Sequence, residues 1–193
     1  MNAEIDVSNT VLKTERLILR PWRQSDLEDL FAYASVDGVG QMAGWPPHKC
    51  LSDSQWILDR FITHKKTFAI EYEGRAVGSV GVEKYKEEQY PEYADMRCRE
   101  IGYVLAKDLW GRGLMPEAVR EVIRWCFEEA GLDVLFCGHF LYNTQSERVQ
   151  EKCGFRHYAY GTFETQLGTV EEHEVRILTK EDWLQDREKE ADS

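Results

Sequence analysis

Two glycines separated by one arginine, Gly111 and Gly113, form the clearest candidate site for binding an anion. A short run of β-branched and aromatic residues, Ile101 to Leu105, precedes them, and Pro116 follows where the first turn of a helix is expected. The first turn of a helix leaves backbone N–H groups without partners and carries the positive end of the helix dipole. Glycines directly before it let a phosphate approach the backbone closely. The pattern predicts a strand, a turn and a helix that together bind a phosphate.

Charged side chains around the turn bear on this prediction. Lys107 and Arg112 would add mobile positive charge, whereas Glu117 would compete for the same field, and we expect Glu117 to turn outward into water. A tight connection without a ligand is the alternative that a bare Gly-x-Gly pattern leaves open. The spacing excludes a P-loop, because no G-x-x-x-x-G-K-[ST] is present, and it lacks the third glycine of a dinucleotide-binding turn.

The elements after the turn predict where the site lies. Apolar residues follow Pro116 at helical spacing, with charged residues on the other side. Leu132 to Phe140 is then an apolar strand, and Asn143 opens a short helix that ends at Gly154. Because a helix joins this strand to the one ending at Leu105, we expect the two to be parallel neighbours with a right-handed crossover. Ligands of open sheets collect at the carboxyl ends of such strands, near the glycine turn and Asn143.

Five further strands and two further helices are predicted in the rest of the chain. The strands are expected over residues 12–20, 68–72, 76–82, 155–165 and 174–179. The helices are expected to open at capping-box patterns, Ser25 with Glu28 and Ser52 with Gln55, and residues 84–99 to form an irregular loop. The order predicts an α/β (α+β) fold in which a mixed sheet carries helices on both faces. We expect one domain over residues 8–185 and a charged, disordered tail over 186–193.

The composition excludes several classes of protein. The formal net charge of the chain, −11, disfavours nucleic acid and anionic membranes as partners. The first nine residues lack the features of a secretory signal, and no apolar run approaches the length of a membrane span. The five cysteines form no C-x-x-C pair, which argues against a disulfide framework and a structural zinc. We therefore expect a cytoplasmic protein that binds no metal.

Several short motifs occur in the order in which one enzyme family carries them. They are Thr14-Glu15-Arg16-Leu17-Ile18-Leu19-Arg20-Pro21, Glu100-Ile101-Gly102-Tyr103, Trp110-Gly111-Arg112-Gly113 with Glu117-Ala118, and Asn143-x-x-Ser146 followed by Lys152-Cys153-Gly154-Phe155. With this set the chain resembles a GNAT-superfamily N-acetyltransferase, in the branch of the ribosomal-protein amino-terminal acetyltransferases (RimJ/RimL-like), over roughly residues 12–183. The resemblance implies a mostly antiparallel central sheet with one parallel, splayed strand pair.

The resemblance also implies a reaction and a set of cofactor contacts. The reaction is transfer of acetyl from acetyl-CoA to a primary amine by direct attack in a ternary complex. The implied contacts are Gly111, Arg112, Gly113, Leu114 and Met115 for the pyrophosphate, and Val104, Leu105, Asn143 and Ser146 for the arm that carries the thioester. The chain departs from the family at Asp108, where Gln or Arg often stands, and so lacks one phosphate ligand.

Aminolysis of a thioester needs a neutral amine, a donor for the oxyanion and a donor for the leaving thiolate. For the thiolate the candidate is Ser146, with simple helix capping as the alternative. Glu100 could deprotonate the incoming ammonium, unless it is only a carboxylate in water at a strand edge. Glu164, in the penultimate strand, is the rival base. A backbone N–H near Val104 or Leu105 is the candidate oxyanion donor.

The acceptor is the least determined part of the prediction. Trp45 and His48 lie in a rigid Gly-Trp-Pro-Pro-His loop and could line the acceptor site, although a surface histidine in a turn is the alternative. The preferred acceptor is the amino terminus of a protein or peptide. A polyamine, an amino sugar or an antibiotic is the alternative within the class, and a non-catalytic acyl-CoA sensor is the alternative outside it. The sequence leaves a monomer and a homodimer both open.

Overall fold

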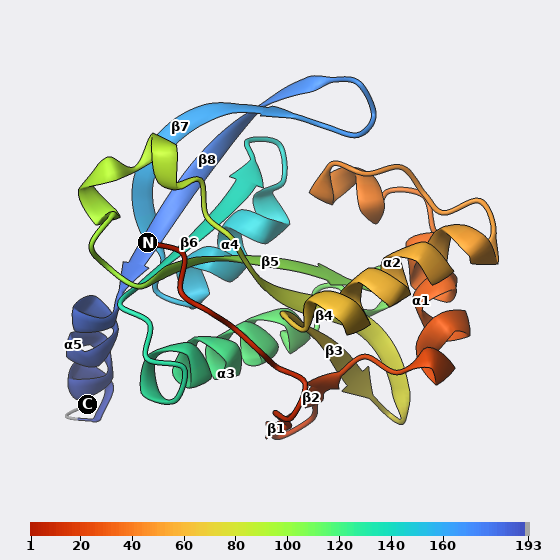
Figure 1. The fold of residues 1–193 in the computed structure, drawn as a ribbon, viewed down its shortest axis with the longest axis horizontal. Coiled ribbons are helices and arrows are strands. Elements are labelled where there is room, and N and C mark those ends of the chain that lie inside the picture. The colour runs from red at the N-terminus through yellow and green to blue at the C-terminus, as the bar shows by residue number, and fades with distance from the viewer. Residues whose placement is uncertain (192–193) are drawn as a thin grey trace.

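A computed structural model describes residues 1–191, which form one eight-stranded sheet in the order β1-β2-β3-β4-β5-β6-β8-β7 (Figure 1). The strands are β1 (Leu12–Lys13), β2 (Ile18–Pro21), β3 (Thr67–Tyr72), β4 (Arg75–Glu83), β5 (Cys98–Leu105), β6 (Val134–Phe140), β7 (Arg156–Glu164) and β8 (Val170–Thr179). The α-helices are α1 (Leu27–Ala34), α2 (Leu51–His64), α3 (Leu114–Glu128), α4 (Thr144–Lys152) and α5 (Lys180–Ala191).

The pairing of the strands confirms the predicted mixed sheet. In the described chain every neighbouring pair is antiparallel except β5 and β6, which are joined through α3 and run parallel. Their pairing ends at Ile101 opposite Cys137, although β5 continues to Leu105 and β6 to Phe140. We call this end of the pairing the fork. Beyond it the two strands part, which is the splayed pair that the resemblance implied.

Helices cover both faces of the sheet, as expected. Phe68 of β3 packs edge-on against Trp125 of α3, with ring centroids 5.4 Å apart. Tyr33 of α1 interacts with Ser79 of β4, and neighbouring residues of a strand point to opposite faces. Because Val80 is the register partner of Phe68, Ser79 and α1 lie on the other side of the sheet. We call the two sides the α3 face and the α1 face. No helix among residues 1–191 is both long and apolar enough to span a bilayer.

The first predicted strand, over residues 12–20, is wrong in its length. The chain turns between β1 and β2, which pair with each other as an antiparallel hairpin. The Thr14 amide donates to the Leu17 carbonyl at 3.0 Å, and the Leu17 amide donates to the Thr14 hydroxyl at 2.9 Å. Side chains of this turn also bind α3, so a tertiary contact interrupts what reads locally as one strand.

The two helices before β3 begin differently from the capping-box prediction. A 3₁₀ turn over Gln24–Asp26 precedes α1, and the Asp26 carboxylate accepts the Arg23 amide at 2.8 Å. At α2 the Asp53 carboxylate accepts the amides of Lys49 and Cys50, at 2.8 and 3.2 Å. Aspartates, in place of the predicted serines, therefore hold the backbone that leads into both helices, since the amides they accept lie just before α1 and α2. The loop predicted over 84–99 is also shorter, because β5 already begins at Cys98.

The prediction of a disordered tail is also corrected, because residues 186–191 belong to helix α5, which continues to Ala191. Trp183 packs on Phe127 of α3 with ring centroids 5.4 Å apart. Asp186 forms an ion pair with Arg156 at 3.2 Å. These contacts give a weakly amphipathic, highly charged segment the tertiary support that its sequence pattern does not reveal. The last two residues of the predicted tail, 192–193, lie outside the described residues.

Candidate active site

The glycine turn places a row of unused backbone amides in front of α3. Gly111 and Gly113 have φ angles of 76° and 77°, in the left-handed region that favours glycine, and Gly113 is the N-cap of α3. Within residues 1–191 no acceptor takes the amides of Gly111, Arg112, Gly113, Leu114 or Met115, and the first helical bond runs from Glu117 to the Gly113 carbonyl at 3.3 Å. Five consecutive donors at the positive end of a helix form a cradle for an anion. The structure thus brings together the residues predicted for the pyrophosphate.

Glu117 does not turn into water as expected. Its carboxylate accepts the Thr14 hydroxyl at 2.6 Å and forms an ion pair with Arg16 at 2.7 Å. Burial raises the pKa of Glu117, but these hydrogen bonds outweigh burial and lower it. Arg16 also donates to the carbonyl of Arg112 at 3.0 Å. The β1–β2 turn therefore neutralises the one carboxylate in the first turn of α3 and fixes the glycine turn at the same time.

The two cations predicted near the phosphate are both tied to backbone carbonyls. Lys107 donates to the carbonyl of Asp37 at 2.9 Å, which links it to the loop after α1. Arg112 donates from Nη2 to the carbonyl of Asp108 at 2.9 Å and is otherwise exposed. Arg112 can swing toward a ligand at the cost of one exposed hydrogen bond, whereas Lys107 holds two segments together. The electrostatic attraction at the turn rests mainly on the backbone amides.

The splayed end of β5 lies shortly before this turn in the chain. Val104 and Leu105 are the last residues of β5 and pair with Ser79 and Gly78 of β4 on one edge only. The carbonyl of Leu105 is already used, because it accepts the indole N–H of Trp110 at 2.8 Å. Trp110 thereby anchors the turn to the strand, a contact that has no signal in the sequence. A ligand arm that enters between the strands can therefore share this carbonyl only through its second lone pair.

Ser146 and Asn143 lie where α4 begins, on the α3 face beside β5. Asn143 is the N-cap, and its side chain accepts the Ser146 amide at 3.1 Å, so Asn143 rather than Ser146 caps the helix. The Ser146 hydroxyl lies 2.9 Å from the Tyr103 hydroxyl, which also donates to the Ser146 carbonyl at 3.1 Å. These contacts connect β5 to the start of α4, the helix that follows β6. Burial raises the pKa of Tyr103 well above its usual value, so its hydroxyl stays protonated.

Two residues outside the predicted site, Gln150 and His139, extend this contact inward. Gln150 is fully buried, and its Nε2 donates to the Ser146 hydroxyl at 3.3 Å and to the Gly138 carbonyl at 3.1 Å. Its Oε1 lies 3.0 Å from His139 Nδ1. Only one signal in the sequence could have identified Gln150: it is a polar residue on the side of α4 that faces the protein interior. His139 is buried and forms part of this network.

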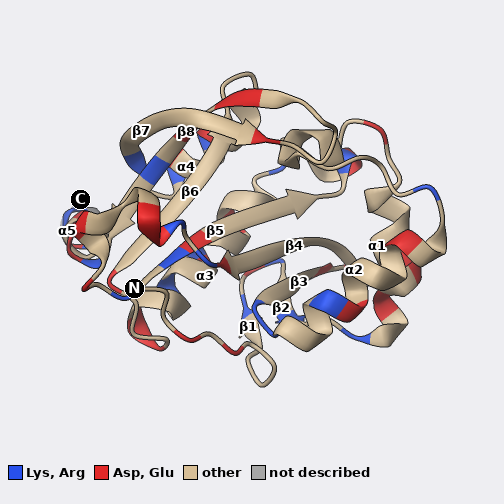
Figure 2. Ribbon diagram, turned by 45° about the horizontal axis from the view of Figure 1, so that its top comes forward, with Lys and Arg blue, Asp and Glu red and all other residues tan. Residues whose placement is uncertain are grey.

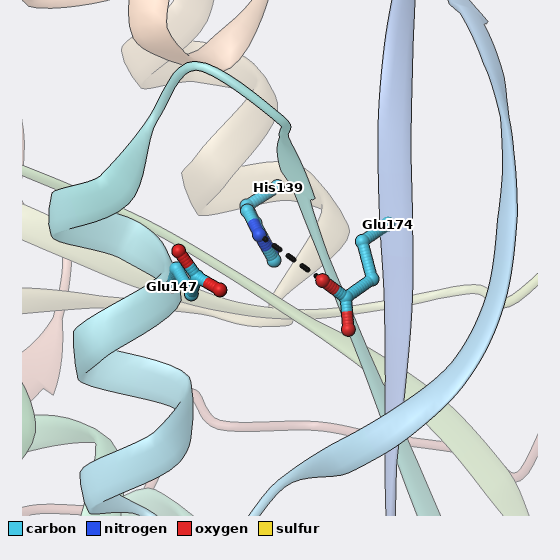
Figure 3. A group of neighbouring side chains, drawn as sticks. All are labelled: His139, Glu147 and Glu174. Carbon is cyan, nitrogen blue, oxygen red and sulfur yellow. Dashed lines mark ion pairs between the residues drawn. The ribbon is translucent and has the colours of Figure 1, made fainter.

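A charged cluster lies at the inner end of the network, where His139, Glu147 and Glu174 point toward one another from β6, α4 and β8 (Figure 3). Their ligating atoms lie within 4.8 Å of one another, a spacing that a metal ion could use. Arg176 already supplies a cation there, with 2.9 Å from its Nε to Glu174 and 3.1 Å from its Nη2 to Glu147. Burial raises the pKa of Glu174, but hydrogen bonds from His157 and Arg176 outweigh burial and lower it. The cluster is therefore charge-compensated by the protein itself.

Glu100 lies at the fork on the α1 face, opposite in the register to Phe136 of β6 and Glu83 of β4. Because Tyr103 is three residues further along the strand, the two side chains point to opposite faces of the sheet. Burial, with a smaller contribution from Glu83 that only Lys86 opposes, raises the pKa of Glu100 from 4.5 to about 7. In the described chain its carboxylate accepts no hydrogen bond. A partly buried carboxylate with such a pKa is suited to accept a proton near neutral pH.

Glu164, the rival base, is exposed at the far end of β7, where it pairs with Val170 near the tip of the β7–β8 hairpin. Acidic positions gather at this end of the hairpin, where Glu171 and Glu172 also lie (Figure 2). The 3₁₀ helix η2 (Gly40–Ala43) and the residue after it reach the same hairpin, because the Gln166 amide donates to the Gly44 carbonyl at 2.8 Å. The loop that follows α1 is thus held against the hairpin on the side of the fork.

Trp45 and His48 lie at the base of this loop. Their rings pack against each other with centroids 5.3 Å apart, and His48 Nδ1 lies 2.7 Å from the Ser54 hydroxyl of α2. The His48 amide donates to the Ala34 carbonyl at 3.0 Å, and burial lowers the pKa of the His48 side chain. Both residues therefore stabilise the loop by their own contacts. A direct role toward an acceptor remains a prediction.

Comparisons with known proteins identify the family of the chain. Residues 16–156 match the family model described as an acetyltransferase (GNAT) domain, which is well over half of the chain. The chain belongs to the GNAT acetyltransferase family. Membership of this family makes it an acetyl-CoA-dependent acyltransferase and confirms the expected fold and class of enzyme.

Individual relatives share only a modest part of the sequence with this chain. The chain is 28% identical over 183 residues to the uncharacterized N-acetyltransferase YoaA of Bacillus subtilis, covering 88% of this chain and 97% of that protein. It is 34% identical over 88 residues to the FsC-acetyl coenzyme A-N(2)-transacetylase of Aspergillus fumigatus, but this match covers 44% of the chain and only 37% of that protein. The solved structure of Mycobacterium smegmatis RimJ in complex with CoA-disulfide superimposes with a TM-score of 0.71 at 21% identity, covering 91% of this chain and 89% of that one. At this identity the likeness shows the shared fold.

Proposed function

We propose that the protein is an N-acetyltransferase that moves the acetyl group of acetyl-CoA to a primary amine by direct attack within a ternary complex. The observation that carries the proposal is the row of five unused amides, from Gly111 to Met115, at the end of a strand that has parted from its neighbour. Such a row fits the diphosphate of coenzyme A, because each phosphate oxygen can accept a hydrogen bond from an amide N–H and the helix dipole attracts the negative charge. Val104, Asn143 and Ser146 are then placed to contact the arm that extends between β5 and β6.

The two faces of the sheet suggest a division of the chemistry. Glu100, on the α1 face, would accept the proton that a primary ammonium must lose before its nitrogen can attack the thioester. The C–N bond forms, the C–S bond breaks, and Ser146, on the α3 face, would donate a hydrogen bond to the departing sulfur. Capping by Asn143 supports this role, because the Ser146 hydroxyl is then not needed to cap α4. Glu164 remains the rival base, and its exposure at the hairpin tip makes it the weaker candidate.

For the acceptor, we propose the amino terminus of a protein or peptide as first choice. The RimJ/RimL-like motifs and the shared fold with RimJ support this choice. The acidic end of the β7–β8 hairpin also suits a cationic acceptor. A small amine is the second candidate, because the partial match to a protein named FsC-acetyl coenzyme A-N(2)-transacetylase is to a name that mentions no ribosomal protein. We place the enzyme in the cytoplasm as part of this proposal, since all five cysteines are unpaired thiols.

The proposal is tested by following release of free CoA thiol from acetyl-CoA with a panel of amines. The panel contains peptides that begin with Ser or Ala, together with spermidine, glucosamine and an aminoglycoside. We expect turnover with at least one peptide, and acetylation at its α-amino group by mass spectrometry. Turnover only with a small amine would move the acceptor to the second candidate. Tight binding of CoA without turnover of any amine would instead make the protein an acyl-CoA sensor.

A further inference from the structure

We propose that the acceptor amine reaches the thioester from the α1 face of the sheet, through an opening that two glycines leave between Glu100 and His173. The glycines are Gly102 and Gly138, and we call the opening the glycine window. The inference rests on the proposed function, because it takes the thioester to lie between the parted strands. It adds a site for the amine and identifies the residues that limit which amines can enter.

Gly102 and Gly138 are the first residues beyond the fork. The last pair of β5 and β6 joins Ile101 to Cys137, so each strand continues with a glycine from the point where the two part. Gly102 lies two residues after Glu100 and therefore faces the same side of the sheet, the α1 face. Gly138 faces this side as well, because a Cβ placed on it would lie 3.8 Å from Glu100 Oε1. Both strands thus present a hydrogen atom instead of a side chain where they separate.

The fold itself does not require glycine at these two positions. Gly78 of β4 shows the contrast, since a Cβ there would lie 2.3 Å from the carbonyl oxygen of Val104. At Gly138 the nearest atom would be 3.6 Å away, an ordinary contact, and at Gly102 no atom of residues 1–191 lies within 4 Å apart from its neighbours in the chain. Neither glycine is among those with a positive φ angle. A glycine inside a strand weakens it and often marks the close approach of a ligand.

The space above Gly102 is open to solvent. Gly102 is exposed, although β5 is an inner strand with β4 on one side and β6 on the other. The open side is the α1 face, since this is where a Cβ on Gly102 would meet no atom. The contact of Tyr33 with Ser79 brings α1 as far as β4, but Gly102 stays uncovered. An amine can therefore approach this part of the sheet directly from solution.

Two polar side chains border the window and have unused hydrogen-bonding capacity. The Glu100 carboxylate accepts no hydrogen bond in the described chain, and its Oε1 is 3.8 Å from the Cβ position of Gly138. His173 approaches the same position from β8, with its Cδ2 3.7 Å away, and its Nδ1 is buried without a hydrogen-bond partner. A nitrogen placed over Gly138 would thus lie between the two side chains.

The charges at the window suit an incoming ammonium group. Burial lowers the pKa of His173, the Gly161 carbonyl opposes this effect, and Lys86 adds to the lowering. The imidazole is therefore neutral at neutral pH and does not repel a cation. Glu100, with its pKa of about 7, is partly ionised there and attracts the ammonium before it accepts the proton. Lys86, which also acts on Glu100, is exposed, so water and salt screen its charge.

Filling the window should block the acceptor without disturbing the cofactor. Gly138→Ala places a methyl group between Glu100 and His173, and Gly102→Val places a residue that strands favour where no atom interferes. With the amine of the panel that the wild-type protein turns over fastest, we expect kcat/KM for the acceptor to fall about tenfold or more in each variant, mainly through KM. The affinity for CoA by calorimetry and the thermal midpoint should stay close to the wild-type values. Ala32→Val, at an exposed position of α1, is the control and should leave all of these values unchanged.

Each other outcome overturns the inference. If both variants bind CoA and acetylate the acceptor as fast as the wild-type protein, the amine does not pass through the window. If CoA affinity falls as much as kcat/KM, the glycines make room for the cofactor arm instead. A thermal midpoint well below that of the wild-type protein in both variants would show that the fold itself needs the glycines. Failure of the wild-type protein to acetylate any amine of the panel would refute the proposed function and the window with it.

Discussion

Replacing Glu100 by glutamine tests two consequences of this buried carboxylate: how much it destabilises the folded protein at high pH, and whether it acts as the base in catalysis. Burial raises the pKa of Glu100 from 4.5 to about 7. The folded protein therefore holds this proton more tightly than the unfolded chain, and folding stability falls as the pH rises from about 5 to about 8. A difference of between two and three units corresponds to at most about 3 kcal/mol, because one unit is worth about 1.4 kcal/mol. At pH 8 this is a large share of the stability of a typical domain.

Glu100→Gln removes the titration while it keeps the shape of the side chain. The free energy of unfolding of each protein is measured in urea at pH 5 and at pH 8. Between these two pH values the wild-type protein should lose up to about 3 kcal/mol that the variant does not lose. With an amine found in the screen, it should lose most of its turnover and the acidic limb of its pH profile near 7. Glu188→Gln, at an exposed position on α5, is the control for removing one carboxylate. If Glu100→Gln and wild type show the same change in unfolding free energy between pH 5 and 8, the reasoning about Glu100 is refuted.

Three further variants test the cofactor turn and Ser146. Gly113→Val places a β-branched residue at a φ of 77° and should raise the KM for acetyl-CoA more than tenfold, whereas an unchanged KM would exclude the amide cradle. Arg16→Ala leaves the carboxylate of Glu117 unpaired beside the cradle and should weaken CoA binding about fivefold by calorimetry. Adding Glu117→Gln should restore the affinity, and a further loss would contradict the electrostatic explanation. Ser146→Ala should lower kcat about tenfold with little change in CoA affinity, and equal rates would reduce Ser146 to a structural residue.

The elements nearest the site were the most predictable from sequence. The strand before Gly111, the helix from Leu114 and the cap at Asn143 each have a strong local signal: a β-branched run, a 3.6-residue apolar stripe, and a capping side chain. Their mutual placement follows from the handedness of a strand–helix–strand connection. Local patterns therefore outlined the phosphate-binding turn, and the resemblance to the GNAT family added coenzyme A and its predicted contacts.

What sequence reasoning missed depends on contacts between distant segments. The strand predicted over 12–20 is divided because Arg16 binds Glu117, about one hundred positions along the chain. The network of Gln150 with Ser146 and His139 joins α4 to β6 and shows in the sequence only as one polar residue in an apolar position. The helix α5 forms because Trp183 finds a packing partner on α3. Such long-range partners override local propensity and cannot be read from spacing alone.

The central claim is that the amides at the start of α3 hold the diphosphate of coenzyme A and that its arm extends between β5 and β6. A crystal structure of the protein with CoA tests it most directly. We expect diphosphate oxygens within hydrogen-bond distance of the amides between Gly111 and Met115, and the sulfur beside the Ser146 hydroxyl. Coenzyme A bound on another surface, or with its sulfur on the far side of β4, would show that this turn is not the cofactor site.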